Sequence, residues 1–88
     1  MSAKDHLQRV RDLGCLICRK MGYHNTPASA HHCFDTSERD DYLTIPLCPE
    51  HHQGKTGFHG MGERAFNMTY KTTELKLLAQ TYRELDRK

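Results

Sequence analysis

The apolar residues near the start of the chain recur at helical intervals. Ser2 and Asp5 have the spacing of a capping box, which marks the first turn of a helix. Gly14 follows as a stop signal. The apolar positions between these signals are Leu7, Val10 and Leu13. The pattern therefore predicts a short helix over residues 3–13, after which the CLIC segment opens a loop that runs to Pro27.

Two segments in the middle of the chain have the composition of strands. Residues 28–34, ASAHHCF, suit a partly buried strand, and residues 42–48, YLTIPLC, are β-branched and apolar. The segment between them, residues 35–41, is polar and charged. We therefore expect a β-hairpin with a long tip.

The last part of the chain has helical signals separated by glycines. Pro49 suits the first turn of a helix over residues 49–53, whereas residues 57–62 are rich in glycine and predict irregular backbone. Residues 63–70 favour a short helix, and Thr73 can cap a final one. The expected apolar face of that final helix consists of Leu75, Leu78, Ala79, Tyr82 and Leu85.

Together these elements predict one small α+β domain that spans residues 1–88. It has an N-terminal helix over 3–13, a strand–strand–helix core over 14–60 and C-terminal helices over 61–88. A chain of 88 residues with 36% hydrophobic residues and no Trp can bury only a small core. Such a domain usually needs a disulfide, a metal or a partner chain, and four Cys and seven His can supply the first two.

Charge and hydropathy help to decide whether a disulfide, a metal or a partner chain stabilises the domain. The formal net charge of +2 permits a nucleic-acid partner but does not indicate one by itself. No apolar stretch is long enough to span a membrane, and the N-terminus lacks the apolar core of a secretion signal. We therefore expect an intracellular protein with reduced thiols, in which C-x-x-C indicates metal or redox chemistry.

The cysteines have the spacing of a structural zinc site. Cys15-x-x-Cys18 is one half-site, and Cys48-x-x-His51 is a second with the same gap. Tetrahedral Zn²⁺ takes four such Cys and His ligands, and a two-residue gap lets a tight turn direct both side chains at one ion. We predict a structural zinc held by these four residues. Cys33 has no paired cysteine nearby, and we expect it to be a small buried residue.

Two other interpretations of the cysteines fit less well. A thioredoxin-like redox pair lies at a helix start after a strand, whereas this C-x-x-C follows a helix. In a C2H2 finger His31 would need a second histidine at positions 35–37, where Asp35, Thr36 and Ser37 stand.

The remaining histidines indicate a second site. His51 and His52 point about 100° apart on a helix, so one ion cannot easily take both. Consecutive residues on a strand point to opposite faces, so His31 and His32 are also expected to have different functions, one binding an ion and the other reaching a water beside it. If the hairpin packs on the helix, one of these two comes near His52. Imidazoles around a divalent ion form a hydrolytic site, where the ion polarises a phosphoryl oxygen and a base activates water.

Three further histidines are less closely tied to this site. His59 would lie about 10 Å from His52 on a continuous helix, so it can share an ion only if the chain bends at Gly54 and Gly57. His6 and His24 are expected to be polar residues on a surface helix and in a loop.

Several short motifs, taken in order, resemble the HNH (ββα-metal) endonucleases. These are a C-x-x-C, an HH on the first strand, and IPLCPEHH from the second strand into the helix. The similarity is greatest to the phage recombination-enhancement Ref group, in which GC-x-x-C-R, TPA…HH, TIPLCP-x-HH and G-x-H-G follow in the same order. It covers residues 13–82, nearly the whole chain.

The resemblance implies roles for individual residues. It implies that His31 and His52 bind the catalytic metal and that His32 is the general base that activates water. By position His59 matches the G-x-H-G histidine and would be a third ligand. The cofactors implied are a structural Zn²⁺ and one catalytic divalent ion, which is Mg²⁺, Mn²⁺, Ni²⁺ or Zn²⁺.

The resemblance also implies a substrate and a setting. The substrate would be DNA, cut with little sequence preference. The setting would be the cytoplasm of a bacterial or phage-infected cell, with a protein partner in recombination or packaging and no membrane. Cationic residues that could line a phosphate track are Arg9, Arg11, Arg19, Lys20, Arg39, Lys55, Arg64 and Lys71. None of them is singled out as a DNA contact.

One departure from the family pattern concerns the hairpin. The middle Asn of the HNH motif is missing from DYLTIPLC. In the family this Asn braces the hairpin loop, and here Asp41 or Thr44 could replace it. The alternative to a nuclease is a non-catalytic zinc-binding module that recognises DNA or protein, which would hold one zinc and no second ion.

Overall fold

The computed structural model describes residues 2–34 and 39–87; residues 35–38 of the predicted turn lie outside the described part. It is an α+β fold with one antiparallel hairpin, as the sequence predicts. In chain order the described elements are α1 (Ala3–Asp12), α2 (Leu16–Lys20), β1 (Ser29–His32), β2 (Thr44–Leu47), α3 (Pro49–Gln53), α4 (Phe58–Met61), α5 (Glu63–Tyr70) and α6 (Glu74–Asp86).

The hairpin is shorter than the sequence predicts, but it has the expected position. β1 pairs with β2 so that His31 lies opposite Ile45 and His32 opposite Thr44. All four residues of β2 are buried, because helices pack against this strand from several directions. In β1, His31 is 1% exposed, whereas His32 on the other face is half-buried. The hairpin therefore presents its two histidines to different surroundings.

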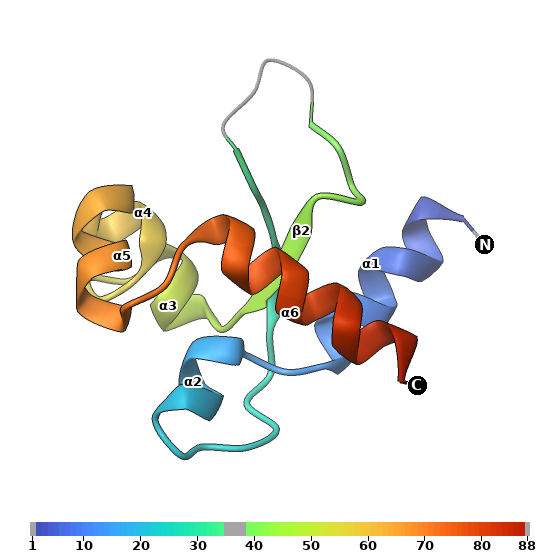
Figure 1. Cartoon of the computed structure of the whole chain (residues 1–88), viewed down its shortest axis with the longest axis horizontal. Helices are drawn as coiled ribbons and strands as arrows, with labels where there is room; N and C mark the ends of the chain where they lie inside the picture. The colour runs from blue at the N-terminus through green and yellow to red at the C-terminus, as the bar shows by residue number, and fades with distance from the viewer. Residues whose placement is uncertain (1, 35–38, 88) are drawn as a thin grey trace.

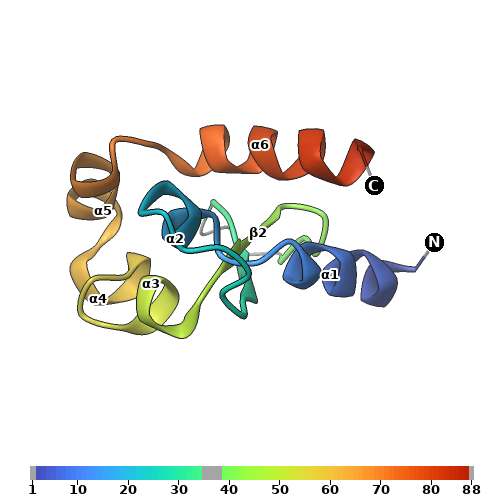
Figure 2. The same ribbon diagram turned by 90° about the horizontal axis from the view of Figure 1, so that it is seen from below.

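The helices enclose the hairpin in a thin molecule of 34 × 33 × 19 Å. In Figure 1, α6 crosses in front of the two strands, with α3, α4 and α5 at one end and α1 at the other. Figure 2 shows α6 as a separate layer along one side of the molecule. The main core lies between these layers and consists of Cys15, Leu16, Ile17, Cys18, Cys33, Ile45, Leu47, Cys48, Phe66, Leu77 and Leu78.

Two helices form where the sequence predicted loop or irregular backbone. α2 begins directly after Cys15, whose side chain accepts from the Cys18 amide, and its apolar residues Leu16 and Ile17 are fully buried. α4 forms within the glycine-dense segment. Both are short, so their stability comes from packing and not from helix propensity.

The buried face of α6 also differs from the prediction. Leu78 and Leu85 are buried as expected, but Leu75 is 65% exposed and Tyr82 is 40% exposed. The other buried positions of this face are Glu74, Leu77 and Thr81. Thr81 can be buried because its hydroxyl donates to the Leu77 carbonyl. The apolar pattern alone missed this face because two of its members are polar.

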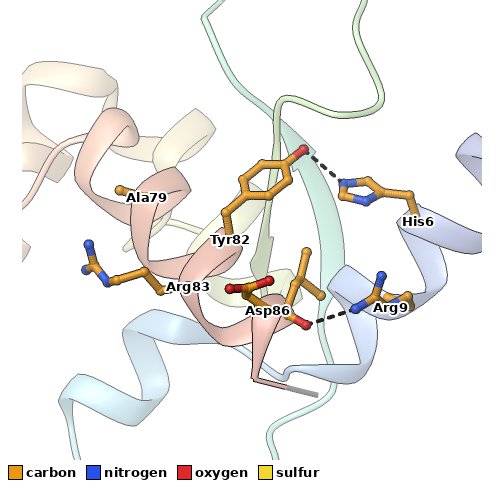
Figure 3. A pocket seen from close by; sticks show the side chains of 7 residues that line it. His6, Arg9, Ala79, Tyr82, Arg83 and Asp86 are labelled. Atoms are coloured by element: carbon orange, nitrogen blue, oxygen red, sulfur yellow. Dashed lines mark hydrogen bonds between the residues drawn. The ribbon is translucent and has the colours of Figure 1, made fainter.

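α1 and α6 pack across a cavity of ≈ 560 Å³ (Figure 3). The prediction that His6 is a surface residue was wrong, because it is only 4% exposed. Its ring lies between Tyr42 and Tyr82, and the Tyr82 hydroxyl is 3.4 Å from its Nε2. Arg9 donates to the Leu85 carbonyl at 2.9 Å. These contacts join the two ends of the chain.

Candidate metal centres

The first candidate centre is a buried group of three thiols and one imidazole. Its four members are Cys15, Cys18, Cys48 and His51. The His51 Nδ1 lies 3.6, 3.5 and 3.2 Å from the three sulfurs in that order, and the Cys18 and Cys48 sulfurs are 3.7 Å apart. No disulfide joins the cysteines of the chain, all of which the structure describes.

The size of this group matches a tetrahedral zinc site. Zinc bonds of 2.0–2.3 Å give edges of about 3.8 Å between two sulfurs and about 3.6 Å between sulfur and nitrogen. The measured separations of 3.2–3.7 Å are close to these values. The residues therefore fit the ion, and this buried group could hold a zinc.

The pKa shifts of Cys15 and His51 are consistent with zinc binding. Burial raises the pKa of the Cys15 thiol to about 12 in the absence of a cation, so a bound Zn²⁺ would be needed to hold it as thiolate. Burial also lowers the pKa of His51, which favours the neutral imidazole that a metal requires. Burial therefore keeps the Cys15 thiol protonated unless a cation is bound.

Backbone conformation brings the two half-sites together. Gly14 has φ +80°, and the next amide, that of Cys15, donates to the Thr26 carbonyl at 3.0 Å. An added Cβ on Gly14 would lie 3.3 Å from that same carbonyl oxygen. On the other side Cys48 caps α3 and Pro49 follows in its first turn, so His51 projects one turn above Cys48.

The second candidate centre is a group of three histidines. One nitrogen from each of His31, His52 and His59 lies within 4.8 Å of the others. The ring centroid of His31 is 5.0 Å from that of His52 and 5.2 Å from that of His59, and the other two rings are 4.9 Å apart. The structure thus separates the adjacent histidines of α3, with His51 among the cysteines and His52 facing the hairpin.

His59 reaches this group because the chain turns back after α3. An added Cβ on Gly57 would lie 2.4 Å from the Glu50 carbonyl oxygen, and one on Gly60 would lie 1.9 Å from that of Gly54. Only glycine allows this close approach of α4 to α3. The bend anticipated at Gly54 and Gly57 is therefore present, and Gly60 is an additional requirement that the sequence analysis missed.

The surroundings of His52 favour its neutral form. Burial, followed by the neighbouring His31, His59 and His32 as potential cations, lowers the pKa of His52 to about 4. Its Nδ1 is 3.0 Å from the Ser29 hydroxyl, which leaves Nε2 for another partner. A neutral imidazole with one nitrogen committed to a hydroxyl is the form that binds a metal.

His32 lies beside this group and has partners of its own. Its Nε2 is 2.8 Å from Asp41 Oδ1, and its Nδ1 is 2.9 Å from Arg39 Nη2. A guanidinium can only donate, so Nδ1 carries the lone pair and Nε2 carries the hydrogen. Thr44 donates to the Asp41 carbonyl at 2.9 Å. Asp41 and Thr44, the two residues suggested as replacements for the missing Asn, are thus hydrogen-bonded to each other, and Asp41 also contacts His32.

Two cavities open on the histidines. One of ≈ 300 Å³ is lined by His32, Arg39, His52 and His59 together with Ala30, Cys33 and Gln53. The other, of ≈ 400 Å³, is lined by His31, His32, Phe58, His59, Gly62, Glu63 and Glu74. His32 and His59 line both cavities.

Glu74 is the residue at this centre that the sequence analysis did not identify. Its carboxylate lies 2.8 Å from His31 Nε2, across 43 positions of sequence. It also belongs to a third buried group with His31 and Cys33, whose possible ligand atoms lie within 4.8 Å of one another. The sequence marks Glu74 only as an acidic residue in the first turn of a helix, which is a common feature.

Several of the cationic candidates for a phosphate track have partners within the protein, among them Arg39 at His32 and Arg11, which donates to Gln8. Arg19 pairs with Glu84 on α6, and Arg9 donates to the end of the same helix. Cys33 is buried, as predicted. No helix in the described residues is long and apolar enough to cross a membrane.

The fold is a small α+β domain with Cys and His groups that could hold metal ions. A family model described as recombination enhancement, RecA-dependent nuclease matches residues 2–86. The chain therefore belongs to that family of nucleases. No curated protein and no solved structure matches it.

Proposed function

We propose that this domain is a metal-dependent DNA endonuclease of the HNH type. The observation that supports the proposal best is the convergence of His31, His52 and His59, with one nitrogen of each within 4.8 Å, beside His32. These three would hold the catalytic divalent ion, while the three cysteines and His51 hold a structural zinc. The family description supports a nuclease acting in recombination, for which DNA is the substrate.

The proposed general base is His32. Asp41 accepts the Nε2 hydrogen and thereby keeps the lone pair on Nδ1, the nitrogen that would take a proton from water. Arg39 donates to that nitrogen in the free domain. Because Arg39 is exposed, it can leave Nδ1 for water and turn to a phosphate oxygen, which a guanidinium binds well. A bound divalent ion would supply the charge that stabilises the phosphate in the transition state.

The test is nicking of supercoiled plasmid with Mg²⁺, Mn²⁺ or Ni²⁺, in the presence and absence of RecA because the family is described as RecA-dependent. Loss of a general base typically slows a reaction about 10²- to 10⁴-fold, and we expect a loss of that order for His32→Ala. His24→Ala changes an exposed histidine of the α2–β1 loop and should nick as the wild type does. Equal nicking by wild type and His32→Ala would show that the base is misassigned.

The same preparation separates the nuclease from a non-catalytic zinc module. Metal content by mass spectrometry, before and after soaking with divalent ions, should rise from one ion per chain to two. The second ion should be lost in His31→Ala and His52→Ala. One zinc, no second ion and no nicking would instead favour the binding module.

A further inference from the structure

Glu74 is a buried acidic residue that the proposed chemistry does not use. It is the first residue of α6, next to the cap residue Thr73, and is 5% exposed. Glutamate is almost never this buried unless it is paired, because a desolvated carboxylate is costly. Its place in the fold therefore needs an explanation in terms of its partners.

Two donors contact the Glu74 carboxylate, and its place at the start of a helix favours its charge. The nearest contact is His31 Nε2 at 2.8 Å, where the side chains are 1% and 6% exposed. The Phe34 amide donates to both carboxylate oxygens at 3.3 Å. The first-turn amides of a 13-residue helix also favour a negative charge at this position. The carboxylate is thus fixed relative to both strand β1 and helix α6.

This arrangement determines which nitrogen of His31 carries the hydrogen. A carboxylate only accepts, so Nε2–H must donate, and in the neutral ring Nδ1 carries the lone pair. Nδ1 is buried and has no hydrogen-bond partner in the part of the chain that the structure describes. A buried acceptor without a donor is costly, and a cation among the three histidines would satisfy it.

We propose that Glu74 is a positioning residue that fixes His31 in the Nε2–H tautomer and directs Nδ1 at the catalytic ion. The inference rests on the proposed ion at His31, His52 and His59. Metal-bound histidines usually donate their second N–H to a carboxylate or carbonyl, which orients the ring and raises its basicity. In this chain the carboxylate comes from α6, outside the strand–strand–helix core.

A direct role for Glu74 as a ligand makes a different prediction. Glu74 also groups with His31 and Cys33, so an ion could lie among these three instead. In that case Cys33→Ala would weaken the second ion as much as a change at Glu74. If Glu74 acts through His31, Cys33→Ala should leave binding of the second ion unchanged.

The first experiment measures metal affinity without any activity. Wild type and Glu74→Gln, each with its structural zinc in place, are titrated calorimetrically with Mn²⁺. We expect one zinc per chain in both proteins and second-ion affinity about 10- to 100-fold weaker in Glu74→Gln, the usual effect of losing such a partner. Glu84→Gln is the matched control, because it alters a partly buried carboxylate of the same helix that pairs with Arg19. It should bind the second ion as the wild type does.

The second experiment reads the tautomer directly and needs no second ion. Long-range ¹⁵N–¹H correlation spectra of the zinc-loaded domain should show His31 as the Nε2–H form in wild type and as a mixture in Glu74→Leu. If Glu74 served only for packing, its removal would not change which nitrogen of His31 carries the hydrogen. A change in tautomer therefore distinguishes a positioning role from a purely structural one.

The possible failures can be distinguished. If wild type binds a second ion and Glu74→Gln binds it equally well, the inference is wrong and the proposed function stands. If Cys33→Ala weakens the ion as strongly, Glu74 is a ligand and not a positioning residue. If wild type binds no second ion, both the proposed function and the inference are overturned.

Discussion

Two residues that are neighbours in sequence, His51 and His52, have very different surroundings in this protein. His51 lies 6% exposed among three cysteines, whereas His52 faces His31 and His59. The sequence predicts this separation because a helix turns adjacent side chains about 100° apart. It could not predict Glu74 at His31, because that contact depends on how α6 packs over a strand 43 positions away.

The split between the two histidines predicts opposite effects of substitution. His51→Ala should lose the zinc and unfold, because zinc binding contributes on the order of 10 kcal/mol to folding in small zinc domains. His52→Ala should keep its zinc and its circular dichroism spectrum but lose the second ion. Metal analysis together with thermal melts checks both variants. Identical behaviour of the two would show that both histidines serve one site.

At the scale of elements, the hairpin and the longer helices follow from sequence pattern, whereas α2 and α4 do not. Periodicity and capping mark α1 and α6, but a five-residue α2 and a four-residue α4 form because tertiary contacts hold them. The expected face of α6 was partly wrong because two of its buried residues are polar. Glu74 is satisfied by His31 from another element, whereas Thr81 donates to the Leu77 carbonyl one turn earlier in the same helix.

The close packing of α4 on α3 predicts a selective effect at Gly60. In Gly60→Ala the added methyl would meet the Gly54 carbonyl oxygen, so α4 must move and take His59 with it. We expect a loss of about 1–3 kcal/mol in the free energy of unfolding, as for other overpacked sites, and weaker binding of the second ion. Urea denaturation and Mn²⁺ titration measure the two effects.

Gly22→Ala is the control for this variant. Gly22 has φ +94° and open space around it, in the loop after α2. Alanine there should cost stability through backbone strain, on the order of 1 kcal/mol, yet leave binding of the second ion intact. If both variants bind the second ion like the wild type, the placement of α4 does not matter for that ion.

At the scale of the whole molecule, the two ends of the chain are joined through His6. Its ring contacts Tyr42 from the hairpin and Tyr82 from α6, so it links three parts of the fold. Sequence pattern places His6 on a helix, but it cannot say that a second helix and a strand connection will cover it. The sequence therefore predicted the helix and missed the burial.

The burial of His6 predicts acid sensitivity. Burial, and then the nearby Arg9, lower the pKa of His6 below its ordinary value of 6.5, an effect that Asp41 partly opposes. The unfolded chain therefore binds more protons as the pH falls below 6.5, and the native state loses stability until the pH has passed the lowered native pKa. His6→Phe keeps a ring between the tyrosines and cannot titrate, so it should lose less stability between pH 7.5 and 5.5.

Urea denaturation at the two pH values measures this difference. The other histidines are the same in both proteins, so their titration cancels in the comparison. His24→Asn removes an exposed histidine and should keep the full acid sensitivity of the wild type. An equal loss of stability in wild type and His6→Phe would exclude His6 as the source.

The position of Glu74 also has a consequence for the order of assembly during translation. The ribosome adds α6 after every cysteine and histidine of the chain, and segments nearer the N-terminus emerge first. The cysteine cluster can therefore capture its zinc while His31 still lacks its carboxylate. On the roles proposed above, the nascent chain binds its structural zinc first. Its catalytic metal site is completed only when α6 packs against the hairpin.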